Sequence, residues 1–175
     1  MRITGGTLAR RVIPTQFAKH VRPTTDRVRE SLLNALSHNY PFCFNSVLDL
    51  YAGSGIVSLE CISRESQNVT SIDKDFKNIK AMKEIQKSWN IQEWAIKKQD
   101  VASYLKSTNE TFDFIFADPP YDAPKLNSLP GICIPKLKAP GILVLEHQPN
   151  IKFDISPSVT KNYGSTVCSI FVKSE

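Results

Sequence analysis

Between residues 47 and 117, short apolar runs alternate with helical patterns, and this alternation restricts the fold more than any other feature of the chain. We expect strands at residues 47–51, 69–73, 94–98 and 112–117, separated by helices at residues 56–63, 76–89 and 101–105. Strands that alternate with helices form parallel sheets, because each helix carries the chain back to the same edge of the sheet. The sequence therefore predicts an α/β fold with a doubly wound, mostly parallel sheet.

The two ends of the chain follow other patterns. Residues 1–23 contain two glycines and two prolines and predict an arm with one short hairpin. A helix is expected from Thr24 or Thr25, which can cap it, to about residue 37. Towards the other end, residues 125–138 are ambiguous because prolines and a glycine interrupt them. Three strands should follow, at residues 141–146, 159–163 and 166–173, the last two as a closing hairpin.

Bulk composition limits the class of protein. A chain of 175 residues is expected to form one domain over residues 1–175 with a substantial core. Its four cysteines are widely spaced, which argues against a zinc site or a disulfide framework and favours a reducing compartment. It contains neither an apolar run of about 18 residues nor the apolar core of a signal peptide. We therefore expect a cytoplasmic protein that binds neither membrane nor metal.

The net charge of +5 is concentrated at the N-terminus. Residues 1–30 hold seven basic side chains and only two acidic ones, whereas the rest of the chain is balanced. A basic arm on a neutral body suits binding to a phosphate backbone, because each neutralised phosphate releases counterions. A solvated tail is the alternative interpretation. The predicted RNA contacts are Arg2, Arg10, Arg11, Arg22, Arg27 and Arg29.

A glycine-rich turn follows the first predicted strand, where open parallel sheets bind ligands. Gly53 and Gly55 allow a tight turn, but the chain has Ser58 where a dinucleotide fingerprint needs a third glycine. Acidic residues stand at the ends of the first two strands and after the third, and these can accept hydrogen bonds from the turn, a ribose and an adenine amine. An ordinary turn with helix-capping acids is the alternative. The set favours an S-adenosylmethionine pocket made by Asp49, Tyr51, Ala52, Gly53, Gly55, Asp73 and Asp100.

The motif Asp118-Pro119-Pro120-Tyr121 follows the strand at residues 112–117 and suits catalysis on an exocyclic amine. The Asp118 carboxylate and the Pro119 carbonyl can accept hydrogen bonds from the two amine hydrogens, and the prolines stiffen the turn that presents them. Tyr121 can stack on a base that lies outside any helix. Asp118 would also accept the departing proton. A merely rigid turn is the alternative, but together the two motifs predict methyl transfer to a nucleobase nitrogen.

Four segments, in order and spacing, resemble the RsmD family of bacterial methyltransferases: residues 2–6 (RITGG), 22–34 (RPTTDRVRESLLN), 49–55 (DLYAGSG) and 118–121 (DPPY). The resemblance covers nearly the whole chain. It implies a class I, Rossmann-like methyltransferase fold with a seven-stranded sheet, S-adenosylmethionine as cofactor, and methylation of guanine N2 in 16S rRNA within assembled or assembling small subunits. Arg22, Thr24, Arg27 and Arg29 would border the active cleft, with Arg27 and Arg29 either contacting RNA phosphate or bracing the cleft.

Two segments depart from the family pattern. Ala9-Arg10-Arg11 replaces the usual Arg-Gly-Arg, and residues 122–140 are shorter and richer in proline. Two other functions stay open at this point. Adenine-N6 methyltransferases of DNA or RNA use the same four-residue motif, and a non-catalytic RNA-binding assembly factor could share the fold.

Overall fold

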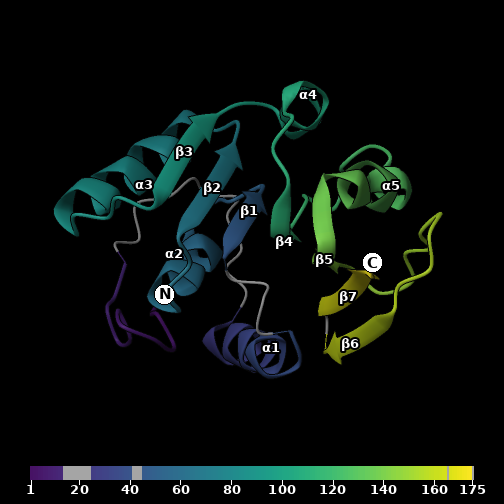
Figure 1. The fold of residues 1–175 in the computed structure, drawn as a ribbon, viewed down its shortest axis with the longest axis horizontal. Coiled ribbons are helices and arrows are strands. Elements are labelled where there is room, and N and C mark those ends of the chain that lie inside the picture. The colour runs from purple at the N-terminus through teal and green to yellow at the C-terminus, as the bar shows by residue number, and fades with distance from the viewer. Residues whose placement is uncertain (14–24, 41–44, 165, 175) are drawn as a thin grey trace.

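Seven strands form one sheet in the order β3-β2-β1-β4-β5-β7-β6 in a computed structural model of the chain (Figure 1). The structure describes residues 1–13, 25–40, 45–164 and 166–174. The strands are β1 (Ser46–Leu50), β2 (Asn68–Asp73), β3 (Trp94–Lys98), β4 (Phe112–Ala117), β5 (Leu137–His147), β6 (Val159–Tyr163) and β7 (Thr166–Lys173). The first five are parallel, and β7 is antiparallel to both β5 and β6. The predicted fold class, with its C-terminal antiparallel hairpin, is confirmed.

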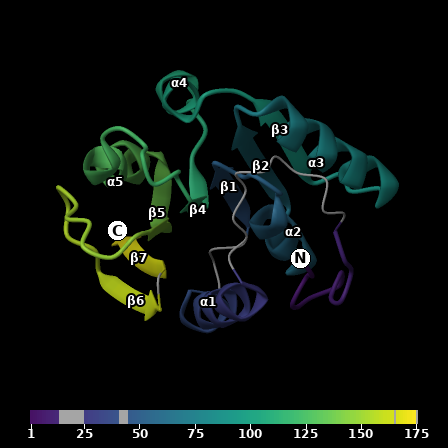
Figure 2. The same ribbon diagram turned by 180° about the vertical axis from the view of Figure 1, so that it is seen from behind.

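Helices cover both faces of the sheet and enclose two apolar clusters. Side chains of α1 (Asp26–Asn39), α2 (Ile56–Ser63) and α3 (Phe76–Ser88) pack on one face. Those of α4 (Val101–Ser107) and α5 (Leu129–Cys133) pack on the other. Figure 2 shows β3 and α3 at one end of the sheet and the β6–β7 hairpin at the opposite end. Because both faces of β1 and β4 are covered, these strands are almost entirely buried.

Helices α1 and α3 begin where side chains cap them. The Thr25 hydroxyl accepts from the Val28 amide (3.4 Å), and the Asp75 carboxylate accepts from the Lys77 amide (2.7 Å). Thr25 is thus one of the two caps that the sequence predicts. Helix α1 continues to Asn39, two residues beyond the predicted end.

The ambiguous segment between β4 and β5 is mostly irregular. It holds the 3-10 turns η2 (Leu126–Ser128) and η3 (Ile134–Lys136) on either side of α5. Strand β5 then begins at Leu137, four residues before the predicted start, and its pairing with β4 shifts register between Phe112 and Phe114. A bulge of this kind lets a strand extend past residues that cannot continue a regular ladder.

The first 13 residues are packed against the domain. Arg2 and Val12 form an antiparallel bridge, as the predicted hairpin requires, and Ile3 and Ile13 are 1% and 0% exposed. The interpretation of these residues as a solvated tail is therefore wrong, because their apolar side chains enter the main core. Residues 14–23 of the predicted arm lie outside the described residues. Among the described helices, none is long and apolar enough to cross a membrane.

Candidate active site

The two predicted motifs meet at one edge of the sheet. Leu50 of β1 pairs with Ile72 of β2 and with Ala117 of β4, and each of these residues is at or near the end of its strand. Ala117 also pairs with Leu145 of β5. The glycine-rich turn after β1 and the Asp-Pro-Pro-Tyr turn after β4 therefore start side by side at the carboxyl edge, where parallel sheets bind ligands.

The glycine-rich turn has a backbone that requires its glycines. Gly53 and Gly55 adopt φ values of 54° and 70°, and Gly55 directly precedes α2. A Cβ on Gly55 would lie 2.7 Å from the Trp94 ring and 2.8 Å from the Met82 sulfur, so any side chain there would displace the core. Tyr51 also has a positive φ, and burial raises the pKa of its hydroxyl to about 12, which keeps it protonated. The half-buried Ala52 contacts the core below the turn.

Asp73 holds the glycine-rich turn in place. Its carboxylate accepts from the Gly53 amide (2.7 Å), from the Asp75 amide (2.7 Å) and from the Asn78 side chain (3.3 Å). The carboxylate is thereby oriented at the end of β2, beside the turn that it fixes. Its predicted contact with ribose hydroxyls stays a prediction.

Asp49 is buried below the turn and points toward the start of α2. It accepts from the Ser58 amide (3.2 Å) and hydroxyl (2.7 Å), and Ser58 in turn contacts the Ser71 hydroxyl (2.6 Å). This explains the serine in place of a third glycine, because its hydroxyl supports the carboxylate. Burial, followed by the nearby negative charge of Asp73, raises the pKa of Asp49 to about 7. A cation at this edge would favour the ionised form.

The end of β3 supplies Asp100, which caps α4 by accepting from the Ser103 amide (3.0 Å). The capping interpretation is therefore correct, and the exposed carboxylate also lies at the carboxyl edge. Phe76 of α3 is 62% exposed, with the Lys98 ammonium 5.5 Å from its ring centroid. Phe76 is the first residue of α3, and its side chain lies outside the core. Its position directly after Asp75, close to the end of β2, is the sequence signal that could have marked it as a candidate site residue.

Asp118 lies directly after β4, next to Glu146 of β5, and no sequence pattern singled out Glu146. Burial, then the negative charges of Glu146 and Asp49, raises the pKa of Asp118 to about 8. Three carboxyl groups from adjacent strands thus repel one another at this edge, an arrangement that suits a positively charged ligand. Pro119 is buried, whereas Pro120 and Tyr121 are exposed, Tyr121 by 50%. An exposed ring beside an acceptor suits binding of a flat base.

The structure separates the predicted RNA contacts into different groups. Arg2, Arg10, Arg11 and Arg27 are exposed, and the Arg11 guanidinium lies 5.1 Å from the Trp89 ring centroid. Arg29 is 1% exposed and forms ion pairs with Glu60 (2.9 Å) and Asp26 (3.0 Å). The prediction that Arg29 contacts RNA is therefore wrong, because a phosphate cannot reach a buried, paired guanidinium. Arg29 has the bracing role instead. Arg22 and Thr24 lie outside the described residues.

No group of three His, Cys, Asp or Glu side chains is placed to hold a metal ion within the part of the chain that the structure describes. The carboxyl edge presents carboxylates, backbone groups, hydroxyls and aromatic rings.

The chain is similar to known proteins over most of its length. The family described as "Conserved hypothetical protein 95" matches residues 1–172. YlbH of Bacillus subtilis (strain 168), which carries a provisional designation as an rRNA methyltransferase, is 31% identical over 99% of both chains. Ribosomal RNA small subunit methyltransferase D of Buchnera aphidicola subsp. Baizongia pistaciae (strain Bp) is 30% identical over 83% of this chain and 74% of its own length.

Solved structures share the fold. YhhF of Escherichia coli, provisionally designated a methyltransferase, superimposes with a TM-score of 0.86 over 99% of this chain and 98% of its own, at 24% identity. The 16S rRNA N2 G1207 methyltransferase RsmC of Thermus thermophilus, solved with AdoMet and guanosine, has a TM-score of 0.65 at 17% identity and matches 88% of this chain and 45% of its own.

Proposed function

Because the chain belongs to the RsmD family, described as "Conserved hypothetical protein 95", we propose that it transfers a methyl group from S-adenosylmethionine to the exocyclic N2 of a guanine in small-subunit (16S) rRNA. The observation that carries this proposal is the pairing of Leu50 with Ala117, which brings the glycine-rich turn and the Asp-Pro-Pro-Tyr turn together. A cofactor at the first turn would meet an amine at the second.

The residues at the edge fit S-adenosylmethionine. This cofactor supplies an electrophilic methyl group on a positively charged sulfur. Burial and the charge of Asp73 raise the pKa of Asp49, and a cation at the glycine-rich turn would favour its ionised form. In this proposal Asp73 accepts from the ribose hydroxyls, the exposed carboxylate of Asp100 accepts from the adenine amine, and the exposed ring of Phe76 packs on the adenine face.

The amine is held by the second turn. The Asp118 carboxylate and the Pro119 carbonyl accept hydrogen bonds from the amine hydrogens, while the exposed Tyr121 ring stacks on the base. A guanine amine is a weak nucleophile because its lone pair is delocalised into the ring, so orientation contributes much of the rate. When the nitrogen gains the methyl group, Asp118 accepts the proton that it loses. The raised pKa of about 8 makes the Asp118 carboxylate a stronger base than an ordinary carboxylate.

The substrate is proposed to be 16S rRNA in assembled or assembling small subunits. Relatives named small subunit methyltransferases support this choice. The exposed Arg2, Arg10, Arg11 and Arg27 on the docked N-terminal residues and α1 supply positive charge for the RNA backbone.

Methyl transfer from labelled S-adenosylmethionine tests the proposal. The substrates are unmodified small subunits, naked 16S rRNA and DNA, with the methylated nucleoside identified by mass spectrometry. N2-methylguanosine from the samples that contain 16S rRNA is expected. N6-methyladenosine would replace the proposal with the adenine-N6 activity, and cofactor binding without transfer to any substrate would favour a non-catalytic assembly factor.

A variant of Asp118 tests the role proposed for this residue in the same assay. Asp118→Ala should abolish transfer and leave the affinity for S-adenosylmethionine nearly unchanged, because Asp118 serves the amine. A large loss of cofactor affinity would contradict the role assigned to Asp118.

A further inference from the structure

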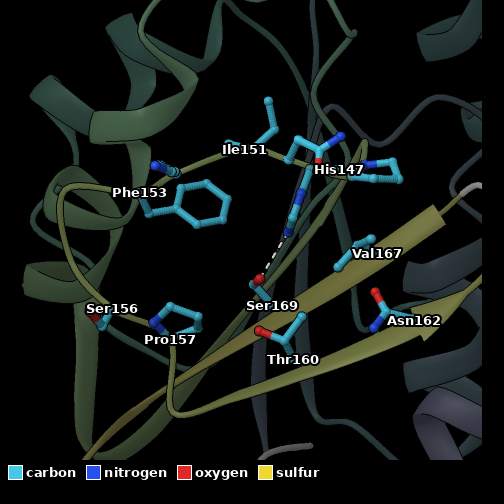
Figure 3. Close-up of a pocket in the computed structure, with 12 residues that line it drawn as sticks. His147, Ile151, Phe153, Ser156, Pro157, Thr160, Asn162, Val167 and Ser169 are labelled. Carbon is cyan, nitrogen blue, oxygen red and sulfur yellow. Dashed lines mark hydrogen bonds between the residues drawn. The ribbon is translucent and has the colours of Figure 1, made fainter.

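A cavity of about 510 Å³ lies over the β6–β7 hairpin and the end of β5 (Figure 3). We call it the hairpin pocket; its lining residues come from β5, β6, β7 and the loop of residues 148–158. Its size is in the range of sites that bind small organic ligands. The floor and walls are formed by His147, Ile151, Phe153, Pro157, Val167 and Ser169.

The floor offers a defined hydrogen-bonding pattern. His147 Nδ1 lies 2.7 Å from the Gln148 carbonyl and its Nε2 lies 2.8 Å from the Ser169 hydroxyl. Burial lowers the pKa of His147, so the ring is neutral at pH 7. A carbonyl can only accept, so Nδ1 carries the proton and Nε2 accepts from Ser169. The Ser169 oxygen therefore keeps its lone pairs for a donor group such as a base amine.

The walls combine an aromatic ring with polar side chains. The Phe153 ring packs edge-to-face between His147 (4.9 Å) and Phe171 (5.5 Å), which holds it in place. Figure 3 shows Phe153 on one side of the pocket and Thr160 and Asn162 of β6 on the other. Lys152, Asn162 and Thr160 are exposed at the rim. A flat ring, hydroxyl and amide groups, and an ammonium together match a base, a ribose and a phosphate.

The hairpin pocket is tied to the catalytic turn. His147 directly follows Glu146 at the end of β5, so their side chains point to opposite faces of the sheet at its carboxyl edge. Strand β7 is two strands from β4, about 10 Å at the usual strand spacing. The loop of residues 148–158 is also hydrogen-bonded to the segment that follows the Asp-Pro-Pro-Tyr motif. Asp154 donates its amide to the Asn127 carbonyl (3.0 Å) and accepts from the Asn127 side chain (2.9 Å). One ligand strand that crosses the carboxyl edge of β5 can contact both places.

We propose that the hairpin pocket binds a nucleotide that flanks the methylated guanine in the same RNA strand. Its base lies against Phe153, its polar edge meets Ser169 and Asn162, and its phosphate meets Lys152. This inference rests on the proposed function, because it takes the ligand of the catalytic turn to be RNA. It adds a second contact through which the RNA is positioned beside Asp118.

The test fills the pocket without touching the catalytic turn. Asn162→Trp places a large ring in the pocket, and the matched control Val159→Trp adds the same ring on β6 at a residue outside the pocket lining. We expect Asn162→Trp to raise the KM for unmodified small subunits about tenfold, the typical effect of removing one stacked base, with kcat and S-adenosylmethionine affinity unchanged. Val159→Trp should retain the wild-type KM. Equal KM values for both variants would overturn the proposal.

A second variant guards against misfolding of the first. Lys152→Gln changes only an exposed rim residue and should flatten the salt dependence of binding to unmodified small subunits by about one phosphate contact. An unchanged salt slope would overturn the phosphate assignment.

Filter binding to small subunits also separates the two proposals. If the wild type forms no N2-methylguanosine, the proposed function fails, while a binding loss confined to Asn162→Trp still supports the pocket.

Discussion

The Arg29 guanidinium donates to Glu60 Oε1 across 2.9 Å, and the two side chains are 1% and 0% exposed. Glu60 also accepts from the Thr4 amide and hydroxyl, each at 2.8 Å, and pairs with Arg64. One buried carboxylate of α2 thus joins α1 and the N-terminal residues. This ion pair connects the basic N-terminal segment to the helix that follows the glycine-rich turn.

Arg29→Ala is expected to lower the free energy of unfolding by about 1–3 kcal/mol, because it removes one of the two arginines that pair with the buried Glu60. Arg27→Ala removes an exposed arginine from the same helix and should change this energy by less than about 0.5 kcal/mol. Urea unfolding of both variants measures the difference. Similar midpoints would mean that the ion pair is not structural.

Gly6→Ala should detach the N-terminal residues from α2. A Cβ at Gly6 would lie 1.7 Å from the Ser63 carbonyl oxygen, and the backbone there has φ of 77°. Gly164→Ala is the matched control, because Gly164 has a similar φ of 72° but no atom within 4 Å of an added Cβ. Hydrogen exchange should accelerate at the Thr7 and Leu8 amides, which donate to Ser63, only in Gly6→Ala. Continued protection of these amides would show that the contact is dispensable.

Asp73→Ala is expected to weaken S-adenosylmethionine binding at least tenfold (about 1.4 kcal/mol), since the Gly53 amide loses the acceptor that orients the turn. Asp113→Ala is the control, because Asp113 also accepts from a backbone amide, that of Ser46, but near the start of β4. Isothermal titration calorimetry measures both affinities. Wild-type affinity in Asp73→Ala would remove Asp73 from the cofactor site.

The rate of methyl transfer should depend on the ionisation of Asp118. Its pKa is raised to about 8, and only the carboxylate accepts a proton, so kcat/KM should rise with pH and level off above about pH 8. Glu146→Gln removes a neighbouring negative charge and should move the midpoint to lower pH. Asp118→Asn should be slow and lack this midpoint. A rate that falls as pH rises from 6 to 8 would instead identify the protonated acid as the active form.

Arg10 and Arg11 should contribute to RNA binding through charge. Replacing both by alanine is expected to weaken binding to 16S rRNA and to flatten the slope of log K against log salt by about 0.7 for each phosphate that is no longer neutralised. Arg11 also contacts Trp89, so thermal unfolding serves to separate a folding defect from a binding defect. An unaltered salt slope would mean that these arginines do not touch RNA.

The sequence was most informative where apolar periodicity is strong. The bounds of β3, β4, β6, β7 and α2 agree with the prediction, β1 is shifted by one residue at both ends, and β2 begins one residue earlier. Glycine-rich and proline-rich turns directly after predicted strands placed the two motifs at one edge, because parallel strands end together. The start of β5 at Leu137 was not predictable, because Pro140 and Gly141 interrupt the local pattern and only pairing with β4 reveals the extension.

The order of strands, helices and motifs was therefore determined by the sequence, because these depend on local spacing and on turn residues. Only the tertiary structure decided which charged side chains are buried and which are adjacent. It placed Arg29 beneath the N-terminal residues, Glu146 beside Asp118, and Phe76 in solvent. The physical reason is that burial and electrostatic coupling depend on what packs against a residue from distant parts of the chain, and helical or strand periodicity does not encode that partner.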